Sequence, residues 1–210
     1  MRVVVTSLGH TEGVALHLSY GPNVPHDGEL RLCGDVSAKR VIELGIAPEV
    51  NAMALARAGA KAIAVDADPV RIAAGRAAAE AEGVRVEFHL GELGDLGFAT
   101  SASIDLVVAA GSLHEIEDLS RVLRQVHRVL RPEAPFVVTL PHPITAMLDD
   151  TGRTLERPYG QVPSRTVSDL FTALSRANFR VDVMQELFPV GRLDAMVPAV
   201  LVLRARKLGV

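Results

Sequence analysis

The segment Arg40-Val-Ile-Glu-Leu-Gly-Ile-Ala-Pro-Glu49 places a short β-branched run directly before a glycine and a proline. A short apolar run bounded by turn residues predicts a buried strand over residues 40–44, followed by a tight turn. A helix is expected to begin near Val50 or Asn51. The segment therefore predicts a strand–turn–helix unit, which is the building block of a sheet covered by helices.

The same alternation continues along the chain. Further β-branched runs occupy residues 61–66, 84–88, 104–108 and 136–140. Residues 68–82 predict a helix, because a proline lies in its first turn and a glycine follows its end. Apolar residues at helical spacing predict another helix over 119–130. Strands that alternate with helices indicate parallel pairing, so the expected fold is α/β, a doubly wound Rossmann-like sheet with helices on both faces.

The chain changes character after residue 140. Prolines and glycines punctuate a polar stretch over residues 142–165, which we expect to be a substrate or lid loop rather than an ordinary surface loop. A helix over 167–177 and strands over 179–187 and 197–206 should follow, with the two strands paired antiparallel. We expect residues 1–210 to form a single domain in which residues 1–39 cover the ligand site.

Composition excludes several classes of protein. The chain has 210 residues, of which 49% are hydrophobic, and this apolar fraction argues against disorder. A formal net charge of −3 gives no footprint for nucleic acid or anionic lipid. A single cysteine, Cys33, rules out an intrachain disulfide. No run approaches the ~18 apolar residues of a membrane span. We therefore expect a cytoplasmic protein without nucleic-acid or membrane partners.

Acidic residues mark the ends of three consecutive predicted strands: Glu43, Asp66 and Glu92. Doubly wound sheets bind ligands beyond the carboxyl ends of their strands, and a carboxylate about 20 residues after the first turn accepts hydrogen bonds from a ribose. Any one of these acids alone could equally be a solvent-exposed carboxylate with no ligand contact. The set favours a nucleoside site.

The turn itself separates two kinds of nucleoside ligand. A pyrophosphate needs bare backbone N–H groups at a helix N-terminus. Pro48 has no N–H, and Glu49 adds negative charge at the same place. These residues disfavour a dinucleotide and favour an adenosine that carries a cationic group, such as S-adenosylmethionine.

Five segments resemble class I S-adenosylmethionine-dependent methyltransferases of the small-molecule, type 11-like kind, and the resemblance runs from about Tyr20 to the C-terminus. They are Val41-Ile-Glu-Leu-Gly45, Ala64-Val-Asp-Ala-Asp68, Ile104-Asp-Leu-Val-Val108, Leu123-Arg-Gln-Val-His-Arg-Val-Leu-Arg-Pro132 and Phe136-Val-Val-Thr-Leu-Pro-His-Pro143. The resemblance implies a seven-stranded sheet whose last strand is antiparallel, with S-adenosylmethionine as cofactor and a small-molecule methyl acceptor. The chain departs from the family pattern after Gly45, where further glycines are replaced by Ala47, Pro48 and Glu49.

The resemblance also implies which residues contact the cofactor. Asp66 would hold the ribose hydroxyls, and Gly45 would line the methionine moiety. The full implied set is Tyr20, Glu43, Gly45, Ile46, Ala47, Asp66, Ala67, Glu92, Leu93, Ala109, Ala110 and Gly111.

Two histidines are candidate general bases for the acceptor, because histidine titrates near neutrality. His114 follows the fourth predicted strand, and His142 follows the fifth. The competing interpretations are a loop histidine that caps a helix for His114 and a structural turn residue for His142. Asp149 and Asp150 lack a third ligand at fixed spacing, so we expect no metal.

Two other functions remain open. The altered turn at 47–49 fits a degenerate, non-catalytic methyltransferase-fold scaffold that has lost the cofactor. A nicotinamide-dependent oxidoreductase is a further alternative, which the missing glycine-rich phosphate cradle disfavours.

Overall fold

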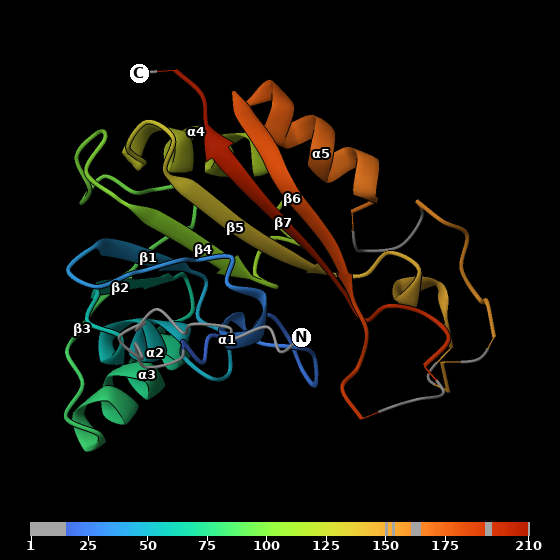
Figure 1. Cartoon of the computed structure of the whole chain (residues 1–210), viewed down its shortest axis with the longest axis horizontal. Helices are drawn as coiled ribbons and strands as arrows, with labels where there is room; N and C mark the ends of the chain where they lie inside the picture. Colours follow the sequence, from blue (N-terminus) through green and yellow to red (C-terminus); the bar gives the residue numbers. More distant parts are fainter. Residues whose placement is uncertain (1–15, 150, 153, 161–164, 192–194, 210) are drawn as a thin grey trace, which may run out of the picture.

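The computed structural model describes residues 16–149, 151–152, 154–160, 165–191 and 195–209. Within these residues, seven strands form one mixed sheet in the order β3-β2-β1-β4-β5-β7-β6 (Figure 1). The strands are β1 (Arg40–Leu44), β2 (Lys61–Asp66), β3 (Val86–Leu90), β4 (Leu106–Ala110), β5 (Pro135–Pro141), β6 (Phe179–Leu187) and β7 (Val200–Lys207). Strands β1 to β5 pair in parallel, whereas β7 lies antiparallel between β5 and β6. The predicted seven-stranded, doubly wound sheet with an antiparallel last strand is confirmed.

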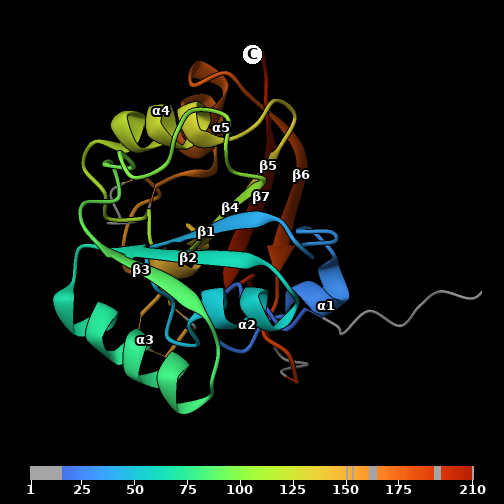
Figure 2. The same ribbon diagram turned by 90° about the vertical axis from the view of Figure 1, so that its left-hand side faces the viewer.

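Helices cover both faces of this sheet (Figures 1 and 2). One face carries α4 (Leu119–Val129) and α5 (Val167–Arg176), and the other carries α1 (Asp27–Leu30), α2 (Asn51–Arg57) and α3 (Pro69–Ala81). Consecutive residues of β1 serve the two layers, since Ile42 packs in a buried cluster with Leu123 of α4, and Val41 packs in a second cluster with Leu55 of α2. Burial on both faces explains why this strand is apolar almost throughout.

Helix starts follow local chemistry. Asp68 caps α3 by accepting a hydrogen bond from the Val70 amide at 2.8 Å, with Pro69 in the first turn. Thr166 and Asp169 form a capping box at the start of α5. Helix α2 begins differently, because its N-cap, Val50, has a left-handed φ of 47° and makes no side-chain cap.

Three strands begin two or three residues later than the sequence predicts. Residue Val84 does not open β3, because its amide donates to Ala79 O at 2.9 Å and closes α3. Before β4 begins, Ile104 forms an isolated bridge with Leu130 at the end of α4. β7 begins only at Val200, since residue 198 is a proline without an N–H for the ladder.

Two segments flank the carboxyl edge of the parallel strands. The N-terminal segment packs against β5, where Thr139 Oγ1 donates to Tyr20 O at 3.0 Å. The expected loop over 142–165 contains the short 3-10 helix η1 (Thr145–Met147) and extends beyond the sheet at the right of Figure 1. Residues 1–15, 150, 153 and 161–164, which belong to these expected segments, lie outside the described residues. In the part of the chain that is described, no helix is long and apolar enough to cross a membrane.

Candidate functional site

A pocket of about 670 Å³ lies at the carboxyl ends of β1, β2 and β4. Five segments line it: residues 20–22, the turn after β1 (45–50), the end of β2 with the start of α3 (66–75), residues 92–93 and the loop after β4 (110–116). The parallel pairing brings these segments to one edge of the sheet, as expected for a doubly wound fold.

Glu43 organises the turn after β1 from inside. Its buried carboxylate accepts backbone hydrogen bonds from Ala47 at 2.9 Å and Asn51 at 3.1 Å on Oε1, and from Ala52 at 2.7 Å on Oε2. Burial raises the pKa of Glu43 to about 7, although the three N–H donors act to lower it. Glu43 therefore satisfies the amides that Val50 leaves uncapped at the start of α2. It does not line the pocket, so its contribution to the site is the shape of the turn.

Gly45 joins the turn to the loop after β4. Its φ of 79° is left-handed, and a Cβ placed there would lie 2.2 Å from Ser112 Cβ. Ser112 Oγ in turn donates to Leu44 O, and the Gly45 amide donates to Val65 O at 2.8 Å. Only a glycine fits both the backbone conformation and this contact.

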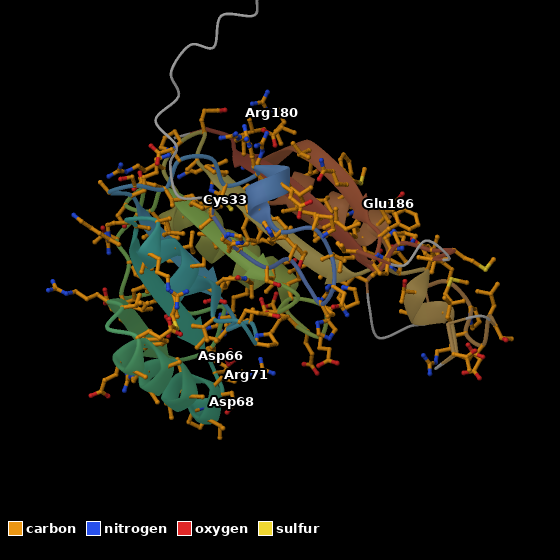
Figure 3. All side chains as sticks on the ribbon, turned by 60° about the horizontal axis from the view of Figure 1, so that its bottom comes forward. Cys33, Asp66, Asp68, Arg71, Arg180 and Glu186 are labelled. Atoms are coloured by element: carbon orange, nitrogen blue, oxygen red, sulfur yellow. The ribbon has the colours of Figure 1, made fainter. Side chains whose placement is uncertain are left out.

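Asp66 presents a fixed carboxylate at the end of β2. One oxygen accepts from the Ile46 amide at 2.8 Å, and the other accepts from the Asp68 amide at 2.8 Å. Arg71 of α3 also reaches this group, with Nη1 3.6 Å from Asp66 Oδ2 and Nε 3.7 Å from Asp68 Oδ2 (Figure 3). Because a carboxylate has about four acceptor positions, both Asp66 oxygens keep room to accept from a diol in the pocket.

The loop after β4 presents a glycine and a histidine to the pocket. Gly111 has a φ of 73°, and a Cβ there would meet nothing within 4 Å, so its surroundings are open. His114 Nδ1 lies 2.6 Å from Gly111 O, and its Nε2 lies 3.3 Å from Glu115 Oε1. A carbonyl partner fixes the proton on Nδ1, which leaves Nε2 of the neutral ring as the acceptor. In that neutral form Nε2 is the nitrogen able to take a proton, and the Glu115 carboxylate beside it favours the imidazolium that would result.

Tyr20 lines the pocket but turns its hydroxyl away from it. The hydroxyl donates to Asp27 Oδ1 at 2.6 Å beside Cys33 Sγ at 3.6 Å. Burial, reinforced by Cys33 and Asp27, raises the pKa of the Tyr20 phenol well above its ordinary value. The neutral phenol is therefore a buried anchor that fixes the N-terminal segment, and its ring and backbone are what the pocket meets.

Most of the implied cofactor residues come together in this pocket. Those that line it are Tyr20, Gly45, Ile46, Ala47, Asp66, Ala67, Glu92, Leu93, Ala110 and Gly111, together with the base candidate His114. Ala109 is fully buried in the sheet core and does not line the pocket, because alternate residues of β4 face opposite layers.

His142 is placed away from the pocket. Its ring is 1% exposed, with Nε2 3.0 Å from Glu186 Oε1 and Nδ1 accepting from the Ile144 amide at 3.2 Å. Both ring nitrogens are therefore held by protein groups at the base of the loop over 142–165. This placement matches the structural turn residue and does not match a general base.

Sequence reasoning missed several pocket residues, among them Arg71, Ser112 and Glu115. Arg71 lies three residues after the helix cap Asp68, the spacing that turns a side chain back toward the cap. That spacing could have predicted the contact between Arg71 and Asp68. No sequence pattern predicts the role of Ser112, because this role depends on its contact with Gly45, which follows another strand.

Comparisons with known proteins find a matching family model and similar curated proteins. Residues 42–138 match a family model described as a methyltransferase domain. Magnesium-protoporphyrin O-methyltransferase from Rhodobacter capsulatus is 34% identical over 122 residues, which are 56% of this chain and 51% of that protein. Ubiquinone biosynthesis O-methyltransferase from Xanthomonas oryzae pv. oryzae is 26% identical over 98 residues, or 47% of this chain and 41% of that protein. The chain spans about half the length of these curated relatives at most.

A solved structure shows the same fold over most of the chain. An S-adenosylmethionine-dependent methyltransferase from Mesorhizobium loti aligns with a TM-score of 0.70 at 24% identity, covering 85% of this chain and 95% of that one. The sheet order and the pocket at its carboxyl edge define the class I methyltransferase fold. Residues 42–138 are thus similar to a methyltransferase domain, and the fold of the chain is that of a solved S-adenosylmethionine-dependent methyltransferase. Among the described residues, no group of three or more histidine, cysteine, aspartate or glutamate side chains is placed to hold a metal ion.

Proposed function

We propose that the protein transfers a methyl group from S-adenosylmethionine to a small-molecule acceptor. The observation that carries this proposal is Asp66, a carboxylate at the end of β2 that two backbone amides hold in the pocket wall. A carboxylate in this position suits the two hydroxyls of an adenosine ribose. Glu49 and Glu92 line the same pocket, and their charge suits a cationic cofactor.

The altered turn fits this cofactor. Pro48 and Glu49 line the pocket rather than filling it, and about 670 Å³ remains beside them. The turn keeps its shape without the family's later glycines, because the Glu43 carboxylate holds the amides of Ala47, Asn51 and Ala52. This arrangement supports cofactor binding over the non-catalytic scaffold.

His114 is the proposed general base. The bound cofactor supplies an already activated methyl group, so the protein has chiefly to orient the acceptor and remove its proton. For a hydroxyl acceptor, Nε2 of His114 takes the proton, while the Gly111 carbonyl holds Nδ1–H. Glu115, 3.3 Å from Nε2, then stabilises the imidazolium that forms. An oxygen acceptor is proposed because both curated relatives named above are O-methyltransferases.

Two segments are proposed to enclose the reactants. The described part of residues 1–39 is fixed beside the cofactor turn by Asn51 and against β5 by Thr139. The loop over 142–165 reaches the pocket wall where Arg165 Nη2 donates to Ile116 O. We therefore assign the acceptor side of the pocket to this loop and the cofactor side to the N-terminal segment.

Isothermal titration calorimetry with S-adenosylhomocysteine tests the proposal. We expect binding by the native protein and a loss of about tenfold or more in Asp66→Asn, because a charge-assisted hydrogen bond to the ribose is removed. Asp118→Asn is the matched control, since Asp118 caps α4 outside the pocket and asparagine also caps helices. Absence of binding at millimolar S-adenosylhomocysteine would overturn the proposal and favour the scaffold.

A further inference from the structure

A second pocket, of about 770 Å³, lies at the opposite edge of the sheet. It is lined by Arg40 and Lys61, the first residues of β1 and β2, and by residues 84–88 around the start of β3. These are the amino ends of parallel strands, whereas the methyl-transfer pocket lies at their carboxyl ends. The two pockets are therefore separated by the length of a strand.

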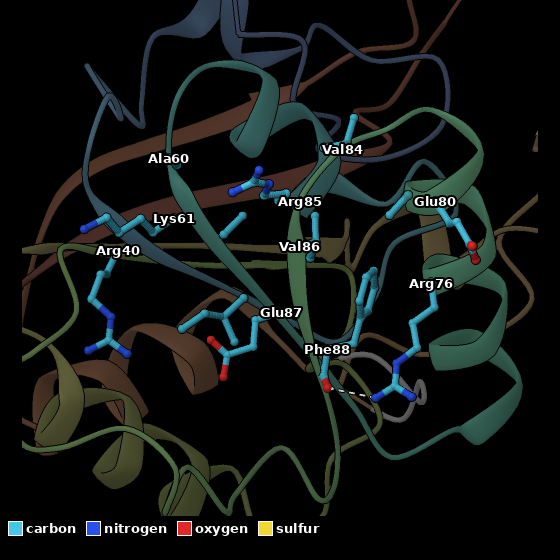
Figure 4. Close-up of a pocket in the computed structure, with 13 residues that line it drawn as sticks. Arg40, Ala60, Lys61, Arg76, Glu80, Val84, Arg85, Val86, Glu87 and Phe88 are labelled. Carbon is cyan, nitrogen blue, oxygen red and sulfur yellow. Dashed lines mark hydrogen bonds between the residues drawn. The ribbon is translucent and has the colours of Figure 1, made fainter.

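Three cationic side chains gather on one side of this second pocket. In Figure 4, Arg40, Lys61 and Arg85 lie on the same side of β3. Phe88 and Arg76 lie on the other side, where Arg76 Nη2 donates to Phe88 O at 3.1 Å. Ile63 adds an apolar residue to the lining. The pocket thus combines a cationic wall with an apolar patch.

The strand register explains why these cations are neighbours. Arg40 is the registered partner of Lys61, and Ala62 is the registered partner of Val86. Continuing the second register back by one residue places Arg85 beside Lys61. Adjacent strands lie about 4.8 Å apart. We call Arg40, Lys61 and Arg85 the cation row. Like charges directly opposite each other on neighbouring strands destabilise a sheet, so the row costs the folded protein stability.

Two carboxylates, Glu80 and Glu87, also line the pocket. Glu87 lies 2.6 Å from His89 Nε2 and makes no ion pair with the row. Asp105, beside Arg40, pairs with Arg131 Nη1 at 2.6 Å and accepts only the backbone amide of Arg40. Within the described part of the chain, the side chains of the row make no ion pair or hydrogen bond. The lining carries four cations, Arg40, Lys61, Arg76 and Arg85, against two carboxylates, so it keeps a net positive charge that suits an anionic ligand.

We propose that the cation row binds a small multivalent oxyanion, a diphosphate or polycarboxylate, at a site separate from methyl transfer. The pocket volume falls in the range of small-molecule sites, about 300–1,000 Å³. Arginine forks on both sides of Lys61 suit oxygen-rich anions, because guanidinium groups bind phosphate and carboxylate with two parallel hydrogen bonds. Repulsion within the row is relieved when the anion binds.

Calorimetry with inorganic pyrophosphate, in the presence of saturating S-adenosylhomocysteine, tests the site. We expect binding by the native protein that weakens about tenfold in Lys61→Gln and in Arg85→Gln. Arg124→Gln, an exposed arginine of α4 outside the pocket, is the matched control and should bind as the native protein does. Citrate in place of pyrophosphate distinguishes a carboxylate ligand from a phosphate ligand.

Thermal unfolding without ligand gives a second readout, in which the substitution that weakens anion binding should raise stability. In low salt, Lys61→Gln should melt at a higher temperature than the native protein, because the central charge of the row is gone. A structural lysine would show the reverse. No binding of either anion at millimolar concentration would overturn the proposal, as would equal weakening in Arg124→Gln. Binding of a duplex oligonucleotide without pyrophosphate binding would also overturn it.

Discussion

Ser19 and Asn51 hold each other through two hydrogen bonds. The Ser19 amide donates to Asn51 Oδ1 at 2.8 Å, and Asn51 Nδ2 donates to Ser19 O at 2.8 Å. Asn51 is 1% exposed, and its own amide donates to Glu43 Oε1 at 3.1 Å. A single side chain therefore ties the N-terminal segment to the turn that shapes the pocket at the carboxyl edge of the sheet.

Asn51→Ala should loosen both parts together. The Ser19 amide and carbonyl lose their partner at a partly buried position, so we expect the free energy of unfolding to fall by about 1–3 kcal/mol. S-adenosylhomocysteine affinity should fall as well, because Tyr20 and Gly21 line the pocket. Urea unfolding and calorimetry measure the two effects. Ser120→Ala, at an exposed position of α4, is the control, and a variant with normal stability and affinity would contradict the proposed link.

Glu43 should make stability depend on pH. Its folded-state pKa of about 7 lies above the ordinary glutamate value. Between the two values the folded protein holds a proton that the unfolded chain has lost, so the contribution of Glu43 is largest below the ordinary pKa and falls as pH rises to about 7. Against Glu43→Gln, the native protein should lose up to about 3 kcal/mol across that window. Chemical unfolding from pH 4.5 to 8 measures the difference, and a flat difference would contradict the raised pKa.

Gly45→Ala should disrupt the pocket without any change of charge. The new Cβ would lie 2.2 Å from Ser112 Cβ at a backbone φ of 79°. We expect a loss of about 1–3 kcal/mol in stability from the left-handed strain and the overlap together. The double variant Gly45→Ala/Ser112→Gly removes the overlap but not the strain, so it should recover part of the loss. No recovery of melting temperature in the double variant would show that the contact with Ser112 is not what requires glycine.

Much of the fold can be predicted from local pattern. β1, β2 and β6 lie where β-branched runs predict them, because a short run of this kind between turn residues favours a strand over a helix. The start of β3 cannot be read this way. Val84 is as β-branched as Val86, and only the hydrogen bond of its amide to Ala79 O assigns it to the end of α3.

The sequence likewise predicts only part of the candidate site. Glu43 and Asp66 are both acids at strand ends, and the sequence treats them alike. The structure separates them through the donors that surround them: three amides enclose Glu43 beneath the turn, whereas Asp66 faces the pocket with one amide on each oxygen. That difference depends on side-chain direction and on loops from other strands, which periodicity does not contain.

The two candidate histidines should respond differently to substitution. His114 lines the pocket with Nε2 available as an acceptor, so His114→Asn should lower kcat toward a hydroxyl acceptor by about 10²–10⁴-fold while S-adenosylhomocysteine affinity stays near native. His142→Asn should instead lower stability, because the bonds to Ile144 N and Glu186 are broken, and should leave kcat near native. Steady-state kinetics with a phenolic acceptor, alongside thermal unfolding, measures both. If His142→Asn lowered kcat to this extent and His114→Asn did not, the assignment of the base would be reversed.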